Sequence, residues 1–141
     1  EGESPGYLLA LALAFARAQS GRSTCPFTKE IEMSREEFRA CIEACYACAA
    51  ACDQCAAACL KEEDVKMMAR CIATDTDCAD ICRTAAALMA RSSEFAQQVC
   101  KLCAQICKAC AEECAKHKAE HCQVCAQACT RCAEACSQMA V

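Results

Sequence analysis

Most cysteines in this sequence recur at alternating intervals of three and four residues. This interval keeps side chains on one face of an α-helix, and it is the spacing of core positions in helical bundles. Three segments carry such a ladder, and their members are Cys41, Cys45, Cys48, Cys52, Cys55 and Cys59; Cys100, Cys103, Cys107, Cys110 and Cys114; and Cys122, Cys125, Cys129, Cys132 and Cys136. A thiol therefore stands where a bundle normally places leucine or isoleucine.

A fourth segment has fewer cysteines, namely Cys71, Cys78 and Cys82. We predict that it forms the cysteine-poor wall of the same core. Asp75 lies inside this segment, where it either hydrogen-bonds to thiols or backbone or faces solvent. Cys25 falls outside the four ladders, so the pattern predicts nineteen inward-pointing cysteines out of twenty.

Dense thiolates favour thiophilic metal ions. Two sulfurs one helical turn apart can hold one ion and a facing helix can add a third, a low-coordinate geometry that suits Cu(I). Zn²⁺ usually takes four tetrahedral ligands, and iron–sulfur clusters usually use cysteines at loop spacings. A zinc-binding or an iron–sulfur or redox protein is therefore the alternative. Thiols acting as apolar filler, or joined in disulfides, are less favoured, because bridges within a helix need an unusual torsion.

Charge balance also favours a monovalent ion. Bare thiolates in a buried core are unfavourable, so the metal-free thiols should be protonated, with raised pKa values. Each bound Cu(I) displaces protons and neutralises roughly one thiolate. We therefore expect a capacity on the order of 15–20 Cu(I) ions per chain.

Four helices are needed to position these ladders, and the sequence places them at about 34–61, 63–91, 94–116 and 118–139. The first is predicted to open at Ser34, with Glu37 at the capping-box spacing. Short connections make neighbouring helices antiparallel, so residues 34–140 are predicted to form an all-α, up-down-up-down four-helix bundle. Charged residues such as Lys108, Glu112 and Glu113 are expected on its outer faces.

Residues 1–33 are predicted to form a separate N-terminal part, an apolar helical segment followed by a linker over 19–33. The run YLLALALAFARA, residues 7–18, is too short for a confident membrane span. It is either an additional helix or a segment derived from an export signal. The net charge of −4, without a basic block, argues against nucleic acid as a partner. No nucleophile–base pair or paired carboxylates indicate an enzyme.

Antiparallel order brings different residue types to the two ends of the bundle. One end is expected to collect Cys59, Met67, Met68, Cys114, His117, His121 and Cys122. Imidazole, thioether and thiolate together are suited to admit copper. The opposite end is expected to collect Phe38, Cys41, Leu88, Met89, Phe95, Cys136 and Met139, which predict an apolar plug.

The chain resembles the bacterial copper storage proteins, and within them the cytosolic branch. The segments that carry the resemblance are CIEACYACAAACDQCAAAC (41–59), CIATDTDCADIC (71–82), CKLCAQICKACAEEC (100–114) and HCQVCAQACTRCAEAC (121–136). The resemblance implies reversible Cu(I) storage, a cytoplasmic homotetramer and copper uptake near the histidines. It implies copper-ligand roles for the nineteen ladder cysteines and for His117, His121 and Met68. The N-terminal apolar run departs from the cytosolic pattern, which leaves export as an alternative location.

Overall fold

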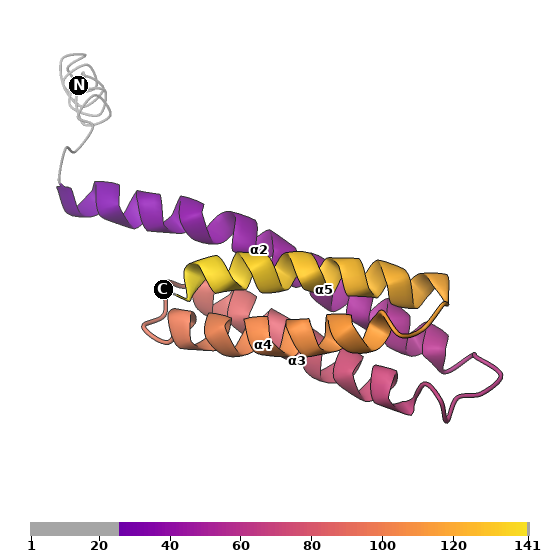
Figure 1. Ribbon diagram of the computed structural model, residues 1–141. Coiled ribbons are helices and arrows are strands. Elements are labelled where there is room, and N and C mark those ends of the chain that lie inside the picture. Colours follow the sequence, from indigo (N-terminus) through magenta and orange to yellow (C-terminus); the bar gives the residue numbers. More distant parts are fainter. Residues whose placement is uncertain (1–25, 141) are drawn as a thin grey trace, which may run out of the picture. The chain divides into compact units, whose positions relative to one another are not determined.

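The structure is a computed structural model that describes the backbone of residues 26–140 and the side chains of residues 38–140 (Figure 1). Within this range the chain forms four α-helices and no strands. They are α2 (Pro26–Cys59), α3 (Ala69–Ala90), α4 (Ala96–Cys114) and α5 (Glu120–Met139). The predicted all-α class is therefore confirmed, whereas the expected helix and linker before Pro26 lie outside the described residues.

Residues Ser34–Val141 form one compact unit, in which the four helices run alongside one another (Figure 1). Contacts between thiols define their directions. Cys41, near the start of this unit, meets Cys136 in the last turns of α5. Cys59, at the end of α2, meets Cys71 at the start of α3 and Cys122 at the start of α5. Cys71 also meets Cys114 at the end of α4. Successive helices are therefore antiparallel, as the short connections predict.

The first helix begins earlier than predicted. The sequence places a linker up to residue 33 and a helix start at Ser34, but α2 begins at Pro26. Proline is favoured at the first position of a helix, because its fixed φ matches the helix and its missing N–H would have no partner there. No glycine or further proline follows it in α2. Ser34 therefore lies inside the helix, and the predicted capping box is wrong.

The connection between α2 and α3 is longer than predicted, because α3 begins at Ala69 and not near Glu63. Residues 60–68 form turns held by bonds between residues three apart, such as those from Met67 N to Asp64 O and from Met68 N to Val65 O. The Asp64 carboxylate also accepts from the Met67 amide at 3.3 Å. Aspartate side chains commonly compete with helix formation in this way. The other boundaries lie within about two residues of prediction, the usual uncertainty of helix ends.

The core of the bundle consists mainly of cysteine and alanine. Buried alanines such as Ala79, Ala85 and Ala86 lie on α3, the helix with the fewest cysteines. Their small side chains let neighbouring helices approach the sulfur face closely. Among the described side chains, the only buried charged ones are Asp75 and Glu113. No helix in the described part of the chain is long and apolar enough to cross a membrane.

Candidate metal centre

Nineteen cysteines form a continuous buried cluster, which we call the thiol core. Each is at most 2% exposed, as the ladder spacing predicts. None of these cysteines is in a disulfide. Sulfur atoms from different helices approach to 3.5 Å, as in Cys45–Cys136 and Cys52–Cys129. A disulfide bond is about 2.05 Å long, so these are separate thiols at a distance that one bridging ion can span.

The thiols group into sets of four along the bundle. In each set the four sulfur atoms lie within 4.8 Å of one another. Four sets share no residue: Cys45, Cys103, Cys132 and Cys136; Cys48, Cys78, Cys82 and Cys107; Cys52, Cys110, Cys125 and Cys129; and Cys55, Cys59, Cys71 and Cys122. Together they contain every cysteine of the thiol core except Cys41, Cys100 and Cys114. We call these sets layers, numbered one to four in this order.

Asp75 takes a position in the wall that a cysteine would otherwise occupy. It is fully buried, and its Oδ1 lies 3.1 Å from the sulfur of Cys110, 3.2 Å from Cys114 and 3.4 Å from Cys125. Of the alternatives that the sequence leaves open, it therefore hydrogen-bonds to thiols. Burial is the main cause that raises the pKa of its carboxyl group to about 9, with a further contribution from its hydrogen bonds to thiols.

The position of Asp75 could have been read from the sequence. Cys71, Asp75, Cys78 and Cys82 are spaced four, three and four, which is the same ladder as on the other helices. The residue type argued against a core position, because a carboxyl group is rarely fully buried unless it has partners. Asp75 thus adds one oxygen atom to a core otherwise lined by sulfur.

His121 is the second residue of α5 and faces the fourth layer. Its Nδ1 lies 3.4 Å from the sulfur of Cys122, 3.5 Å from Cys55 and 3.9 Å from Cys59. Its Nε2 lies 2.8 Å from Oε1 of Glu62, in the connection between α2 and α3. Burial lowers the pKa of His121, but the interactions with Cys55 and Glu62 outweigh it and raise the pKa overall.

A surface pocket of about 360 Å³ lies beside this histidine. It is lined by residues of α2 and α5, namely Ala51, Gln54, Cys55, Glu120, His121 and Val124. A buried thiol and an imidazole thus border space that an ion can reach from solvent. We call this region the histidine end.

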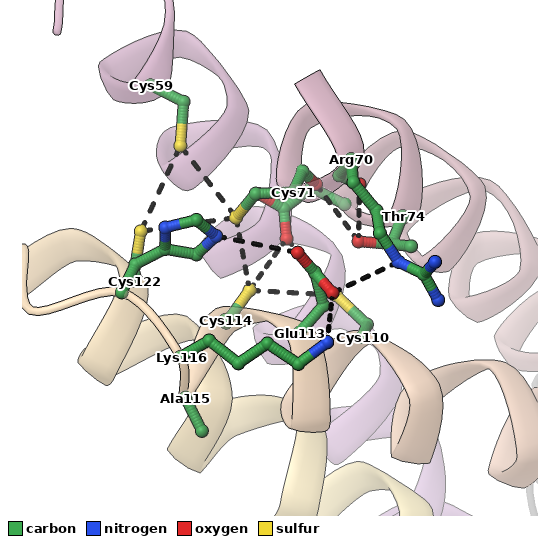
Figure 2. Close-up of polar contacts among 12 residues, drawn as sticks. Cys59, Arg70, Cys71, Thr74, Cys110, Glu113, Cys114, Ala115, Lys116 and Cys122 are labelled. Atoms are coloured by element: carbon green, nitrogen blue, oxygen red, sulfur yellow. Dashed lines mark hydrogen bonds and ion pairs between the residues drawn. The ribbon is translucent and has the colours of Figure 1, made fainter. Parts of the chain in front are cut away.

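His117 is brought to the same end of the bundle as His121, but it faces a carboxylate. Its Nε2 lies 3.5 Å from Oε1 of Glu113 and makes no hydrogen bond within the described part of the chain. Glu113 is also held by Arg70 at 3.0 Å and by Lys116 at 2.7 Å, as Figure 2 shows beside the thiols of the fourth layer. The hydrogen bond from Lys116 is the main cause that lowers the pKa of Glu113. The expectation that Glu113 faces outward is wrong, because it is buried against this network.

The two methionines predicted at this end differ in exposure. Met68 is buried in the core, with 7% of its surface exposed. Met67 is 69% exposed, because it lies in the turns before α3 and not on a helix. Any role of Met67 in packing the core is therefore excluded, whereas Met68 lies next to the start of α3.

The opposite end of the thiol core is covered by apolar side chains, although not by all those predicted. Met89 is buried, and Phe38, Leu88 and Met139 pack partly buried against the core. Phe95 is 54% exposed, because it precedes α4 and lies outside its sulfur face. The apolar plug is therefore present without Phe95.

The protonation of the fourth layer follows from its environment. Burial is the main cause that raises the pKa of Cys59 to about 11, and it also raises the pKa values of Cys71 and Cys122. Cys55 differs, because hydrogen bonds from Cys114 and Cys125 lower its pKa, with a further contribution from His121. Three of the four thiols therefore keep their protons in the metal-free protein, and Cys55 ionises most easily.

Fold and site together define a class of protein: a four-helix bundle whose core is a row of soft metal ligands. The sequence of residues 34–141 matches the copper storage protein family, and the chain belongs to that family. It is 50% identical over 82 residues to the cysteine-rich protein YhjQ of Bacillus subtilis, a match that covers 58% of this chain and 76% of that protein.

Solved structures of copper storage proteins share the fold. The Cu(I)-bound copper storage protein BsCsp3 of Bacillus subtilis is 48% identical, with a TM-score of 0.72 over 74% of this chain and 99% of that one. A cytosolic copper storage protein from Streptomyces lividans, with five coppers, is 43% identical, with a TM-score of 0.74 over 77% and 96%. The similarity thus covers the whole bundle and includes proteins with copper bound.

Proposed function

We propose that this protein stores many Cu(I) ions reversibly on the thiolates of its core. The observation that carries this proposal is the division of the thiol core into four successive layers, each with four sulfurs within 4.8 Å. Ions can occupy such a row at successive levels, because sulfurs of neighbouring layers also approach one another, as Cys82 and Cys103 do at 3.7 Å and Cys48 and Cys129 do at 3.6 Å. A protein that passes on single ions needs only one such site.

Charge favours Cu(I) over a divalent ion. Four thiolates around one Zn²⁺ leave a charge of −2 in each layer, whereas Cu(I) and thiolate in equal numbers are neutral. The only buried charged residues among the described side chains, Asp75 and Glu113, are acids, so no buried cation balances an excess of thiolate. Burial of uncompensated charge is strongly unfavourable. Zinc therefore remains the weaker candidate, although four-sulfur layers suit its tetrahedral preference.

The proposed ligands are the nineteen cysteines of the thiol core, with additional donors near the histidine end. His121 presents Nδ1 to three thiols, and Asp75 presents an oxygen to three others. His117 and Met68 complete the proposed set, because both lie at the end where copper would enter. We further propose a cytoplasmic location and a homotetramer, supported by membership of the family and by the similarity to a cytosolic relative.

A Cu(I) titration tests storage directly. The reduced protein, in competition with a strong Cu(I) chelator under anaerobic conditions, is expected to take up about 15–20 ions per chain, since each ion neutralises about one thiolate. Replacing the second layer (Cys48, Cys78, Cys82 and Cys107) with alanine should lower this number by about four. Cys25→Ser is the control, and it should leave the capacity of the core unchanged. Saturation at one or two ions would reject storage.

Replacing both His117 and His121 with alanine is expected to slow copper uptake and release about tenfold, while capacity falls by no more than about two ions. The physical reason is that the imidazoles border the thiols at one end, whereas the other layers are unaltered. Stopped-flow mixing with a Cu(I)–chelator complex measures the rates. Lys118→Ala, between the two histidines, serves as the control. Equal rates in the double variant and the unaltered protein would argue against uptake at this end.

A further inference from the structure

Glu62 and His121 form a contact that joins an irregular segment to the thiol core. Glu62 lies among the turns of residues 60–68, outside any helix, and His121 lies in the first turn of α5. Oε1 of Glu62 and Nε2 of His121 are 2.8 Å apart, the shortest polar contact that either side chain makes in the structure. The carboxylate is 42% exposed and the imidazole is 22% exposed.

We propose that Glu62 is a positioning residue that fixes which nitrogen of His121 meets copper. This inference rests on the proposed storage of Cu(I). A carboxylate only accepts hydrogen bonds, so Nε2 of His121 must donate its proton to Glu62. In the neutral imidazole the other nitrogen, Nδ1, then carries a lone pair.

That lone pair is directed at the fourth layer. Nδ1 lies 3.4–3.9 Å from the sulfur atoms of Cys122, Cys55 and Cys59. Without Glu62 the proton can move to Nδ1, where it blocks the donor atom, and the ring is free to rotate away. A carboxylate that accepts from the second nitrogen of a metal-binding histidine commonly fixes its tautomer and orientation in this way.

The second histidine does not have this arrangement. His117 faces Glu113 at 3.5 Å without a hydrogen bond, and Glu113 is already held by Arg70 and Lys116. Among the described residues, His121 is therefore the histidine with a carboxylate at hydrogen-bond distance on one nitrogen and thiols on the other. Glu62 thereby couples the connection between α2 and α3 to the proposed route of copper.

Three variants test the role of Glu62. Glu62→Ala removes the acceptor, whereas Glu62→Gln removes the charge but keeps an amide oxygen that accepts from Nε2. Glu63→Ala is the matched control, because it removes the same charge from an exposed neighbour in the same turns. All three substitutions lie on the surface and leave the thiol core intact.

The first measurement uses the reduced, metal-free protein. ¹⁵N NMR of the imidazole, at an alkaline pH where the ring is neutral, is expected to show the Nε2–H tautomer in the unaltered protein, in Glu62→Gln and in Glu63→Ala. Glu62→Ala should show a mixture of tautomers. The same mixture in the unaltered protein, or an unchanged tautomer in Glu62→Ala, overturns the proposal.

The second measurement is the rate of Cu(I) uptake from a Cu(I)–chelator complex. Glu62→Ala is expected to be about tenfold slower, within the range found when such partners of metal-binding histidines are removed. Glu62→Gln should recover most of the rate, and capacity should be unchanged in all three. If Glu62→Gln takes up Cu(I) as slowly as Glu62→Ala, the uptake rate depends on the charge of Glu62 and not on its hydrogen bond. That result overturns the proposal. The tautomer is measured without copper, so the hydrogen bond between Glu62 and His121 can be tested even if the protein does not store Cu(I). A failure of the proposed storage and a failure of this proposal are therefore distinguishable.

Discussion

Filling the thiol core with Cu(I) is expected to raise the midpoint of thermal unfolding by more than about 20 °C. An ion at one hundred times its dissociation constant adds about 2.7 kcal/mol if it binds only the folded state. Unfolded cysteines also bind Cu(I), which offsets part of this gain. A net gain of about 5 kcal/mol nevertheless corresponds to about 20 °C for a bundle of this size. Thermal unfolding followed by circular dichroism, with and without copper, measures the shift.

The metal-free core has little else to stabilise it. Cysteine and alanine bury less apolar area than the leucine and isoleucine that usually fill a bundle. The variant with alanine throughout the second layer is the control, because it binds fewer ions and should show a smaller rise. Equal midpoints for the loaded and metal-free forms of the unaltered protein would show that Cu(I) binds the folded and unfolded chains equally well, which contradicts a core built for copper.

The second large effect concerns pH and Asp75. The contribution of Asp75 to the stability of the reduced, metal-free protein is expected to fall as the pH rises between 3.8, the ordinary pKa of this carboxyl group, and about 9, its pKa in the folded state. Over this interval the folded state binds one more proton than the unfolded state, so a rise in pH favours unfolding. The contribution of Asp75 is at most about 1.4 kcal/mol per pH unit. Asp75→Asn should lack it, since an amide does not titrate.

Urea unfolding at a series of pH values, with a reductant present, measures this effect. The difference in free energy of unfolding between Asp75→Asn and the unaltered protein should grow steadily with pH, because the thiols titrate in both. Asp77→Asn, an exposed aspartate on the same helix, is the control and should follow the unaltered protein. A constant difference for Asp75→Asn would mean that the carboxyl group is ionised in the folded state.

The ladder made most of the bundle predictable. An interval of three and four residues fixes a face of a helix whatever the neighbours are, so nineteen buried cysteines followed from the sequence alone. Asp75 obeys the same interval, but a carboxyl group is unusual there, so the sequence left open whether it meets thiols, backbone or solvent. The start of α3 depends on local competition, in which Asp64 binds the backbone of Met67.

Contacts between side chains of different helices and turns could not be predicted from the sequence. Glu62 and His121 are 59 residues apart, and Glu62 lies where no periodic pattern exists to place it. Glu113 was expected on the outer face, and its burial depends on Arg70 from a neighbouring helix. Such pairs depend on how the helices and the turns between them pack, which the spacing along a single helix does not encode.

The unlike ends of the bundle have a consequence for the order in which copper is exchanged. Imidazoles and a pocket border one end, whereas Met89 and its apolar neighbours cover the other. If copper enters at the histidine end, as we propose, an ion bound in the first layer passes positions that later ions then fill. We therefore expect the stored copper ions to exchange in a fixed order, in which the last ion to bind is the first to leave. Copper bound near the histidine end would then exchange quickly with the cell. Copper bound in the deeper layers would be released only under prolonged shortage.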